Sequence, residues 1–311
     1  MQIVLVDPSR TVRRIVTDLV QQWKYDVRPF SDGAEAFSFV QQNGSVRVLI
    51  TSAELPSMSG VELCVRVRAL LGNRRPLYII IMSSNDEFTK CVQALDHGAD
   101  DFICKPPVPE ELRARLRTAD RVTSMQYELV RLATTDYLTG LSNRRAFFEN
   151  AAKVIERAQH GHAVSAVMFD LDHFKQINDV YGHEIGDAVL KRVAGEIAPL
   201  PGITGRLGGE EFGLLVESDL SGVFDIAQEF RRAVERLEIF AVEQPVAVTC
   251  SLGVAEWEAR DTIDTLLRRA DVALYEAKRT GRNKVVAADT YALSDQHNEW
   301  RGAARVLNRT S

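Results

Sequence analysis

Cysteine is scarce in this sequence, with four residues among 311. Cys64, Cys91, Cys104 and Cys250 form no C-x-x-C pair, and their neighbours are mostly apolar. We therefore expect buried free thiols in a reducing compartment, and we expect neither disulfide bonds nor a zinc site.

Long apolar segments and an excess of basic residues are also missing. The longest apolar run, Leu77 to Met82, is far too short to cross a bilayer. The sequence begins directly with a strand-like segment, so we expect no signal peptide. A net charge of -5 argues against a general nucleic-acid coat, which needs a basic surface. We expect a cytoplasmic protein without a membrane segment or a DNA partner.

The length of 311 residues favours two domains. Short apolar β-branched runs alternate with amphipathic stretches over the first ~120 residues, which predicts a doubly wound parallel (βα)5 domain at 1–108. The expected strands are Ile3–Val6, Val27–Phe30, Val46–Thr51, Leu77–Met82 and Asp101–Ile103, and helices are expected at Arg10–Trp23, Gly60–Leu71 and Glu87–His97.

A single long helix is predicted over 109–134, a segment that lacks glycine and, after Pro109, proline. Its apolar residues recur every three or four positions, close to a heptad repeat. The repeat comprises Leu112, Leu116, Ala119, Val122, Met125, Leu129 and Leu132. The helix either packs on its own domain or leaves it to form a parallel coiled coil with a second copy.

An α+β domain is predicted at 135–289, followed by a loosely attached tail at 290–311. The expected strands are Ser165–Asp170, Gly205–Leu207, Gly213–Val216 and Val246–Val254. The expected helices are Arg144–Ala158, Phe174–Tyr181, Gly186–Ile197, Val223–Leu237 and Ile263–Arg279.

An apolar strand that ends in carboxylates precedes a predicted helix in the segment Phe169-Asp170-Leu171-Asp172-His173-Phe174-Lys175. Such carboxylates suit Mg²⁺ on a polyphosphate, because hard oxygen ligands hold the ion while backbone N–H groups hold the phosphates. The alternative is that Asp170 or Asp172 simply caps the helix.

A Gly-Gly pair between two short apolar strands, at Gly208 and Gly209, predicts a tight hairpin. Glu210 and Glu211 follow at its tip. They either form a solvated turn or complete a divalent-metal cage opposite Asp170.

Two further motifs could bind a nucleotide. Small residues around Gly182 and Gly186 predict a turn between two helices. This turn would bring Asn178 and Asp187 to the same edge of a site. There they either hydrogen-bond the edge of a guanine base or act as ordinary turn and cap residues. At the end of the last predicted helix, the basic segment 278–283 either complements the helix dipole or contacts phosphates.

Together these segments resemble the GGDEF family of diguanylate cyclases over roughly residues 130 to 288. Four motifs occur in the family's order. They are Asp136-Tyr-Leu-Thr-Gly-Leu-Ser-Asn143-Arg144, the segment Asp170–Asp187, the GGEEF hairpin Gly208–Phe212, and Tyr275-Glu-Ala-Lys278-x-x-Gly281-Arg282-Asn283.

The resemblance implies a GTP substrate and two Mg²⁺ ions per active site, with Mn²⁺ as an alternative ion. It implies metal binding by Asp170, the Leu171 backbone carbonyl and Glu210, and catalytic roles for Glu210 and Glu211, of which Glu211 would complete the metal site or assist removal of the ribose proton. The implied substrate-binding residues surround the phosphates or the guanine, and they are His173, Phe174, Lys175, Asn178, His183, Asp187, Lys278 and Arg282. Glutamate at the third hairpin position is an accepted variant, so inactivity is not expected.

The implied reaction joins two GTP molecules into cyclic di-GMP with loss of pyrophosphate, by attack of each 3′-hydroxyl on the other α-phosphate. Because each domain presents one nucleotide, two domains must meet face to face. We therefore expect a homodimer that forms through the first domain and the linker helix. The R-x-x-D motif that marks the family's inhibitory product site is replaced by Pro199-Leu-Pro-Gly202, and we expect no product inhibition there.

The N-terminal half resembles response-regulator receiver domains in its strand order and in Asp7, Ser83 and Lys105, which follow the first, fourth and fifth strands. The place of the phosphate-accepting aspartate is occupied by Ser52, and the second acidic place by Pro8. An acyl phosphate requires a carboxylate, so we expect a pseudo-receiver that responds to an upstream signalling partner in some other way.

Three alternatives compete with an active cyclase. A catalytically silent GTP-binding or cyclic-di-GMP-binding protein would be expected to lack part of the catalytic set, which is intact here. A transcription factor would need a helix-turn-helix with a basic face, and no such pattern follows residue 120. An enzyme that uses ATP beside GTP is less favoured, since Asp187 suits guanine.

Overall fold

The computed structural model describes residues 1–72, 75–84, 95–241 and 244–288. The chain divides into two compact units, of which the first is Met1–Arg131 and the second begins at Leu132. Cys91, most of the helix expected at 87–97 and the tail from 290 lie outside the described residues. Within the described ranges, no helix is both long and apolar enough to span a membrane.

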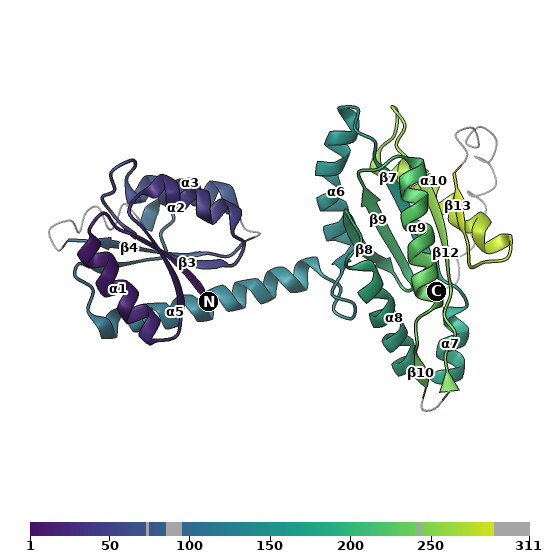
Figure 1. Cartoon of the computed structure of the whole chain (residues 1–311), viewed down its shortest axis with the longest axis horizontal. Coiled ribbons are helices and arrows are strands. Elements are labelled where there is room, and N and C mark those ends of the chain that lie inside the picture. The colour runs from purple at the N-terminus through teal and green to yellow at the C-terminus, as the bar shows by residue number, and fades with distance from the viewer. Residues whose placement is uncertain (73–74, 85–94, 242–243, 289–311) are drawn as a thin grey trace, which may run out of the picture. The chain divides into compact units, whose positions relative to one another are not determined.

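The first unit is built on a parallel five-stranded sheet in the order β2-β1-β3-β4-β5. Its strands are β1 (Gln2–Val6), β2 (Asp26–Phe30), β3 (Val46–Ser52), β4 (Tyr78–Ser83) and β5 (Asp101–Cys104), and its helices are α1 (Arg10–Gln22), α2 (Gly33–Gln42), α3 (Gly60–Leu71) and α5 (Pro109–Thr134). The predicted doubly wound fold is confirmed (Figure 1).

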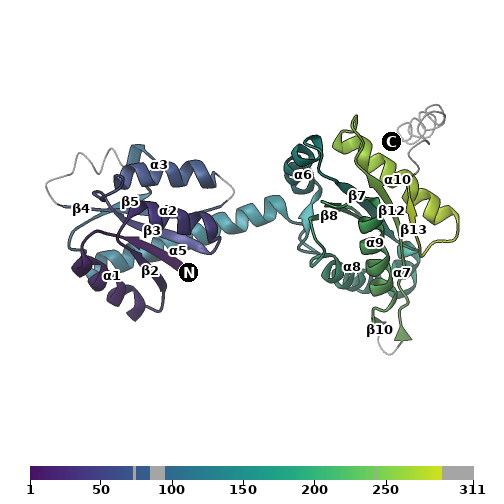
Figure 2. The ribbon, with the colours of Figure 1, turned by 45° about the horizontal axis from the view of Figure 1, so that its top comes forward.

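Helices cover both faces of this sheet because alternate strand residues point to opposite sides. Val4, Val6 and Leu49 pack with α2 and α3, whereas Ile3 and Leu5 pack with α1 and α5. Figure 2 shows the sheet between these helices. Ser9, Asp32 and Ser59 cap the first three helices, each accepting backbone N–H groups of the first turn.

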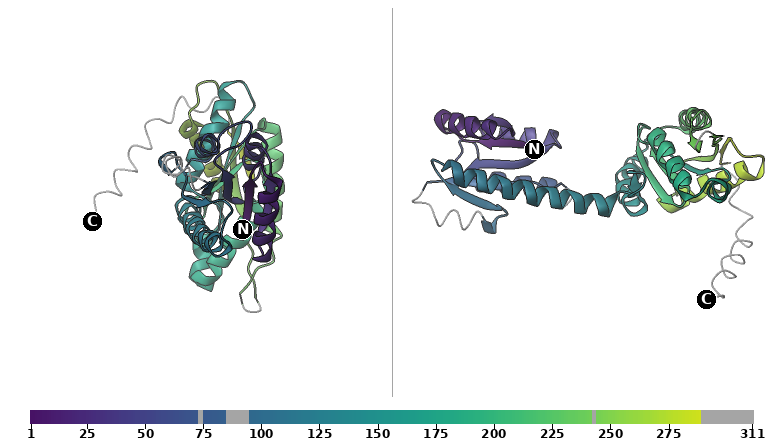
Figure 3. Two further views of the ribbon diagram at one scale, coloured as in Figure 1. Left: turned by 90° about the vertical axis from the view of Figure 1, so that its left-hand side faces the viewer. Right: turned by 90° about the horizontal axis from the view of Figure 1, so that it is seen from below.

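The long helix α5 has the bounds that the sequence predicts, but its apolar residues divide into two groups. Leu112, Leu116 and Ala119 are buried in the core of the first unit. The apolar residues of the second half are 58–65% exposed, namely Met125, Leu129 and Leu132. The first half therefore packs on its own domain, as the ribbon shows in Figure 3. The second half carries an exposed apolar stripe.

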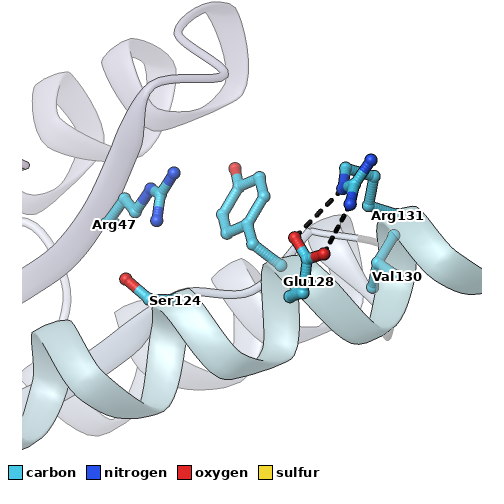
Figure 4. A pocket seen from close by; sticks show the side chains of 6 residues that line it. Arg47, Ser124, Glu128, Val130 and Arg131 are labelled. Atoms are coloured by element: carbon cyan, nitrogen blue, oxygen red, sulfur yellow. Dashed lines mark hydrogen bonds and ion pairs between the residues drawn. The ribbon is translucent and has the colours of Figure 1, made fainter. Parts of the chain in front are cut away.

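Tyr127 attaches the middle of α5 to the first unit. The Arg47 guanidinium lies 4.0 Å from the centroid of the Tyr127 ring, and the Tyr127 hydroxyl donates to the Gly44 carbonyl at 3.3 Å. Arg47 and Tyr127 line an open pocket together with Ser124, Glu128, Val130 and Arg131, whose side chains Figure 4 shows. Glu128 forms an ion pair with Arg131 at 2.6 Å. These contacts hold α5 at Tyr127 against the first unit.

The second unit contains a six-stranded sheet in the order β13-β12-β7-β9-β8-β6. Its strands are β6 (Ser142–Asn143), β7 (Ser165–Leu171), β8 (Ile203–Gly208), β9 (Glu211–Val216), β12 (Cys250–Glu256) and β13 (Val285–Ala287). Its helices are α6 (Arg144–Gln159), α7 (Phe174–Tyr181), α8 (His183–Ile197), α9 (Leu220–Glu235) and α10 (Ile263–Arg279). One face packs against α7, α8 and α9, and the other packs against α6 and α10.

Several expected boundaries in this unit were wrong. The last long strand begins at Cys250 and not at Val246, and a separate short ladder of β10 (Phe240–Ala241) and β11 (Gln244–Pro245) precedes it. Helix α9 begins at Leu220 because the Asp219 side chain accepts from Gly222 N–H. Helix α8 begins at His183, so the turn expected between the two helices consists of Gly182 alone. Gly182 has a φ of +83°, a conformation that glycine tolerates.

The cysteine expectation also needs correction. Cys64 and Cys250 are buried free thiols, but Cys104 is exposed. It is the last residue of β5, which is an edge strand of the sheet.

Helix α10 packs directly on β12 at Gly253. A Cβ at this position would lie 2.0 Å from the Ala270 carbonyl oxygen and 2.2 Å from the Leu274 nitrogen. The missing side chain therefore sets how closely α10, which carries Lys278, approaches the sheet.

We predict that Gly253→Ala lowers the free energy of unfolding by about 1–3 kcal/mol, since the helix backbone has to move away. Chemical denaturation measures the change. The matched control is Gly195→Ala at an exposed position of α8, where nothing lies within 4 Å of the added Cβ, and it should raise the free energy of unfolding by roughly 0.5–1 kcal/mol. Equal effects of both substitutions would contradict this account of the packing.

Candidate functional site

The carboxylate site lies where β7 ends between its two neighbouring strands. Antiparallel pairing places Asp170 opposite Glu211 on β9 and opposite Ser251 on β12. The Asp170 side chain is 9% exposed. The register therefore makes two acidic side chains, distant in sequence, direct cross-strand neighbours.

The predicted hairpin between β8 and β9 is confirmed, with a turn at Gly209 and Glu210. Gly209 has a φ of +41°, a conformation that favours glycine. Glu210 is half-buried and Glu211 is exposed. The turn thus presents the two glutamates at the tip beside Asp170.

Lys278 forms an ion pair with Asp170, with 2.8 Å between Nζ and Oδ2. Burial nevertheless raises the pKa of Asp170 to about 6; Lys278 lowers it in part, and the negative charges of Glu210 and Glu211 raise it further. The carboxylates are thus near enough to repel one another. Such a site favours an additional cation.

The Asp172 carboxylate links the end of β7 to neighbouring segments through hydrogen bonds. It accepts hydrogen bonds from Thr249 Oγ1 at 2.8 Å, Ser251 Oγ at 2.7 Å and the Asn283 N–H at 3.0 Å. The alternative that Asp170 or Asp172 caps the next helix is wrong, because the N-cap of α7 is His173, at φ +57° and without a side-chain cap bond. This anchoring role of Asp172 was not predicted. Its signal in the sequence is a second acidic residue, with a threonine and a serine at the start of another strand.

The helix pair α7–α8 brings the expected guanine-reading residues together. Gly186 lies inside α8, and a Cβ there would be 1.9 Å from Asn178 Oδ1, so the amide occupies the space that glycine leaves. Asp187, the next residue, is exposed, as are His183 and Lys175.

The segment after α10 turns back toward β7. Arg282 is exposed and has a φ of +60°. Asn283 donates from Nδ2 to Glu235 at 2.8 Å and accepts from Arg231 at 2.7 Å. Lys278 thus contacts a carboxylate directly, while Arg282 remains available to solvent.

A second polar cluster lies at the carboxyl ends of the strands in the first unit, where parallel strands place it. Lys105 Nζ lies 2.5 Å from Asp7 Oδ2 and 2.6 Å from Ser52 Oγ. Asp7, Ser52 and Ser83 are buried, and Ser83 accepts the Lys105 N–H at its carbonyl, at 2.8 Å. All four residues that the sequence predicts for this cluster therefore lie together.

The residues of the second unit fit a magnesium ion. Asp170 and Glu210 would supply hard carboxylate oxygens and Leu171 a backbone carbonyl, and waters commonly complete such a shell. Three carboxylates, those of Asp170, Glu210 and Glu211, lie near the single ammonium of Lys278, and a cation would relieve the repulsion among them. In the described ranges, however, no group of three His, Cys, Asp or Glu side chains has metal-binding geometry; the Lys278 ammonium already lies on Asp170.

Comparison with known proteins assigns both units. Residues 3–117 match the response regulator receiver domain, and residues 133–284 match the domain described as diguanylate cyclase, GGDEF domain. The chain therefore consists of a receiver domain followed by a GGDEF domain, the organisation of a response regulator with a GGDEF output domain.

The similarity extends to individual proteins. The response regulator PleD of Caulobacter vibrioides is 31% identical over 300 residues, which cover 91% of this chain and 65% of PleD. The diguanylate cyclase VdcA of Vibrio cholerae is 36% identical over 183 residues, 57% of this chain and 53% of that protein. The chain thus spans less than two thirds of the length of these relatives.

A solved structure agrees with the fold of the second half. The coiled coil and GGDEF domain of DgcB from Caulobacter crescentus, solved in complex with c-di-GMP, matches with a TM-score of 0.53 and 32% identity. The match covers 58% of this chain and 98% of that one.

We predict a pH-dependent stability effect of Asp170→Asn in metal-free buffer. The carboxyl has a pKa of about 6 in the folded protein and near 4 when unfolded, so the folded state binds the proton more tightly. Its contribution to stability is therefore present below pH 4 and is lost as the pH rises to 6. The free energy of unfolding of the variant minus that of the wild type should rise by about 2–3 kcal/mol between pH 4 and 6.5.

Denaturant titrations at several pH values measure this difference. A difference that stays flat over that range would show that Asp170 ionises as it does in solvent.

Proposed function

We propose that this protein is a cytoplasmic diguanylate cyclase, which condenses two GTP molecules into cyclic di-GMP and pyrophosphate. The observation that carries the proposal is the buried carboxylate of Asp170 within a GGDEF domain, directly opposite Glu211 and near Glu210 of the hairpin turn. A catalytically silent binding protein is the alternative. It is disfavoured because a buried, partly uncompensated carboxylate is costly to keep without a catalytic use.

Asp170, the Leu171 carbonyl and Glu210 would hold magnesium, with two ions per site and Mn²⁺ as an alternative. Bound there, the ions would lower the pKa of the attacking 3′-hydroxyl and stabilise charge on the transferring phosphoryl group. Glu211, exposed beside Asp170, would complete the site or assist removal of the hydroxyl proton.

The nucleotide would lie across the start of α7 and the rim of α8. The N-terminus of α7 has no side-chain cap, so the backbone amides of His173, Phe174 and Lys175 would bind phosphate oxygens. Asn178 and Asp187 would bind the guanine edge, with His183 nearby.

Lys278 and Arg282 would hold the triphosphate. Lys278 now pairs with Asp170, and the ammonium would move to the phosphates once a metal ion neutralises that carboxylate. This exchange would keep each charge paired in both states.

Two copies have to meet, because one domain presents one nucleotide while the product contains two symmetric linkages. The apolar stripe of Met125, Leu129 and Leu132, spaced by four and three residues, would pair with the same stripe of a second copy. The receiver domain would contribute the rest of the dimer.

The receiver domain would regulate the dimer without accepting phosphate. Ser52 and Asp7 already share the Lys105 ammonium, and a serine cannot form the acyl phosphate of a phosphoaspartate. An upstream partner that binds this domain would supply the signal.

We predict that Asp170→Ala and Glu210→Ala each lower cyclic di-GMP formation from GTP by ~10³ or more, as loss of a metal ligand should. Chromatography of the products formed by purified protein with Mg²⁺ measures the rate. The control Glu229→Ala, on the exposed face of α9, should keep the wild-type rate. Near wild-type product formation by either carboxylate variant would refute the assignment.

We also predict that Leu129→Glu shifts the protein from dimer to monomer and lowers the rate per chain at least tenfold, because a charge enters the apolar stripe. Light scattering and the rate at increasing protein concentration measure both effects. The matched control Ser124→Glu places the same charge at another exposed position of α5 and should leave the dimer intact. A dimeric, active Leu129→Glu protein would exclude this stripe as the interface.

A further inference from the structure

The side chain of Arg206 bridges two segments that are distant in sequence. Its Nη1 lies 2.9 Å from Asp136 Oδ1, and its Nε donates to the Gly209 carbonyl at 2.9 Å. The two side chains of the ion pair are only 14% and 17% exposed. One guanidinium therefore ties Asp136 to the turn that carries Glu210.

Asp136 lies two residues after α5 ends and holds a compact turn. Its Oδ1 accepts from the Thr139 N–H at 3.0 Å and from Thr139 Oγ1 at 2.7 Å, and its own N–H donates to the Leu141 carbonyl. Burial alone would raise the pKa of Asp136, but the bonds from Thr139 and Arg206 outweigh it and leave the pKa below its usual value. The carboxylate is thus charged and firmly placed.

The same turn is joined to β8 through the backbone. β6 pairs in parallel with β8, which sets Asn143 opposite Arg206. The Asn143 side chain donates to the carbonyl of Ala133 in the last turn of α5 at 2.9 Å and caps α6 through Ala146 N–H. The end of the linker helix and the strand that leads to the hairpin therefore form one bonded assembly.

The hairpin tip depends on this assembly because the ladder is irregular there. The β8–β9 register shifts between Arg206 and Gly208, so regular pairing does not define the turn by itself. The bond from Arg206 fixes the Gly209 carbonyl, and the next residue is Glu210.

We propose that Arg206 is a positioning residue that transmits the placement of the segment after α5 to the hairpin tip, and so sets where Glu210 lies. The inference rests on the proposed cyclase function. The guanidinium is planar with a fixed fork of donors, so it passes on a displacement where a flexible ammonium would absorb it. A shift of about 1 Å at a catalytic group can cost 10²-fold in rate.

The test compares Arg206→Gln, Asp136→Asn and the double variant in the full-length protein. Each single variant should lower kcat about 10- to 100-fold and change KM less than about threefold, because GTP binding residues are untouched. The double variant should be no slower than the slower single variant, since both substitutions break one connection. Arg206→Lys should not restore kcat.

The matched control is Arg157→Gln, which removes an ion pair with Glu217 between α6 and the far end of β9. Its kcat should stay within twofold of the wild type. If Asp136→Asn keeps the wild-type kcat, or if the two single effects multiply in the double variant, the relay is wrong and Arg206 is a local contact.

Hydrogen–deuterium exchange gives a readout that does not need catalysis. Asp136→Asn should accelerate amide exchange in the hairpin, residues 207–212, 70 or more positions away in sequence, while exchange in β7 and β12 stays unchanged. Unchanged hairpin exchange would overturn the relay even in an inactive protein. A wild-type protein that forms no cyclic di-GMP but shows the exchange effect would instead overturn the proposed function alone.

Discussion

The antiparallel pairing of β7 with β9 and β12 is the constraint on which the site depends. It sets Asp170 opposite Glu211 on one side and Ser251 on the other, and a slip of one residue would turn these side chains to the opposite face of the sheet. Asp172 opposes such a slip, because its carboxylate accepts hydrogen bonds from Thr249, Ser251 and the backbone N–H of Asn283. Two acidic residues separated by Leu171 thus have different roles: Asp172 holds the register, and Asp170 lies opposite Glu211 of the hairpin.

Each of the two polar sites contains a buried aspartate whose negative charge has to be compensated, and the two sites differ in how this is done. In each, a lysine lies on a buried aspartate, Lys105 on Asp7 and Lys278 on Asp170. In the receiver domain the lysine also contacts the neutral hydroxyl of Ser52, and the charges are balanced. In the GGDEF domain burial raises the pKa of Asp170 although Lys278 lowers it in part, and the negative charges of Glu210 and Glu211 raise it further. Three carboxylates there face one lysine. An excess of negative charge makes the second site suitable for a cation, whereas the first is already satisfied.

Helix α5 connects these domains with one half buried and the other half exposed. Its first half belongs to the receiver core, and the contact of Tyr127 with Arg47 fixes it further along. Its last turn is bonded to the GGDEF domain through Ala133 and Asn143. The helix thus has contacts in the receiver domain through its first half and in the GGDEF domain through its last turn, and the connection proposed for Arg206 starts from the segment that follows this last turn.

The sequence by itself determined the elements and the chemistry of the site. Hydrophobic periodicity predicted the bounds of α5, α7 and α10, and the Gly-Gly pair predicted the hairpin, because these depend on local spacing and on glycine's backbone freedom. Which side chains contact one another was decided by the tertiary structure alone. That Lys278 pairs with Asp170, that Asn178 fills the space at Gly186, and that Arg206 reaches both Asp136 and Gly209 depend on strand register and helix packing. The sequence also did not determine which part of the α5 repeat is buried and which part is exposed, since a heptad pattern predicts an apolar face but not which surface covers it.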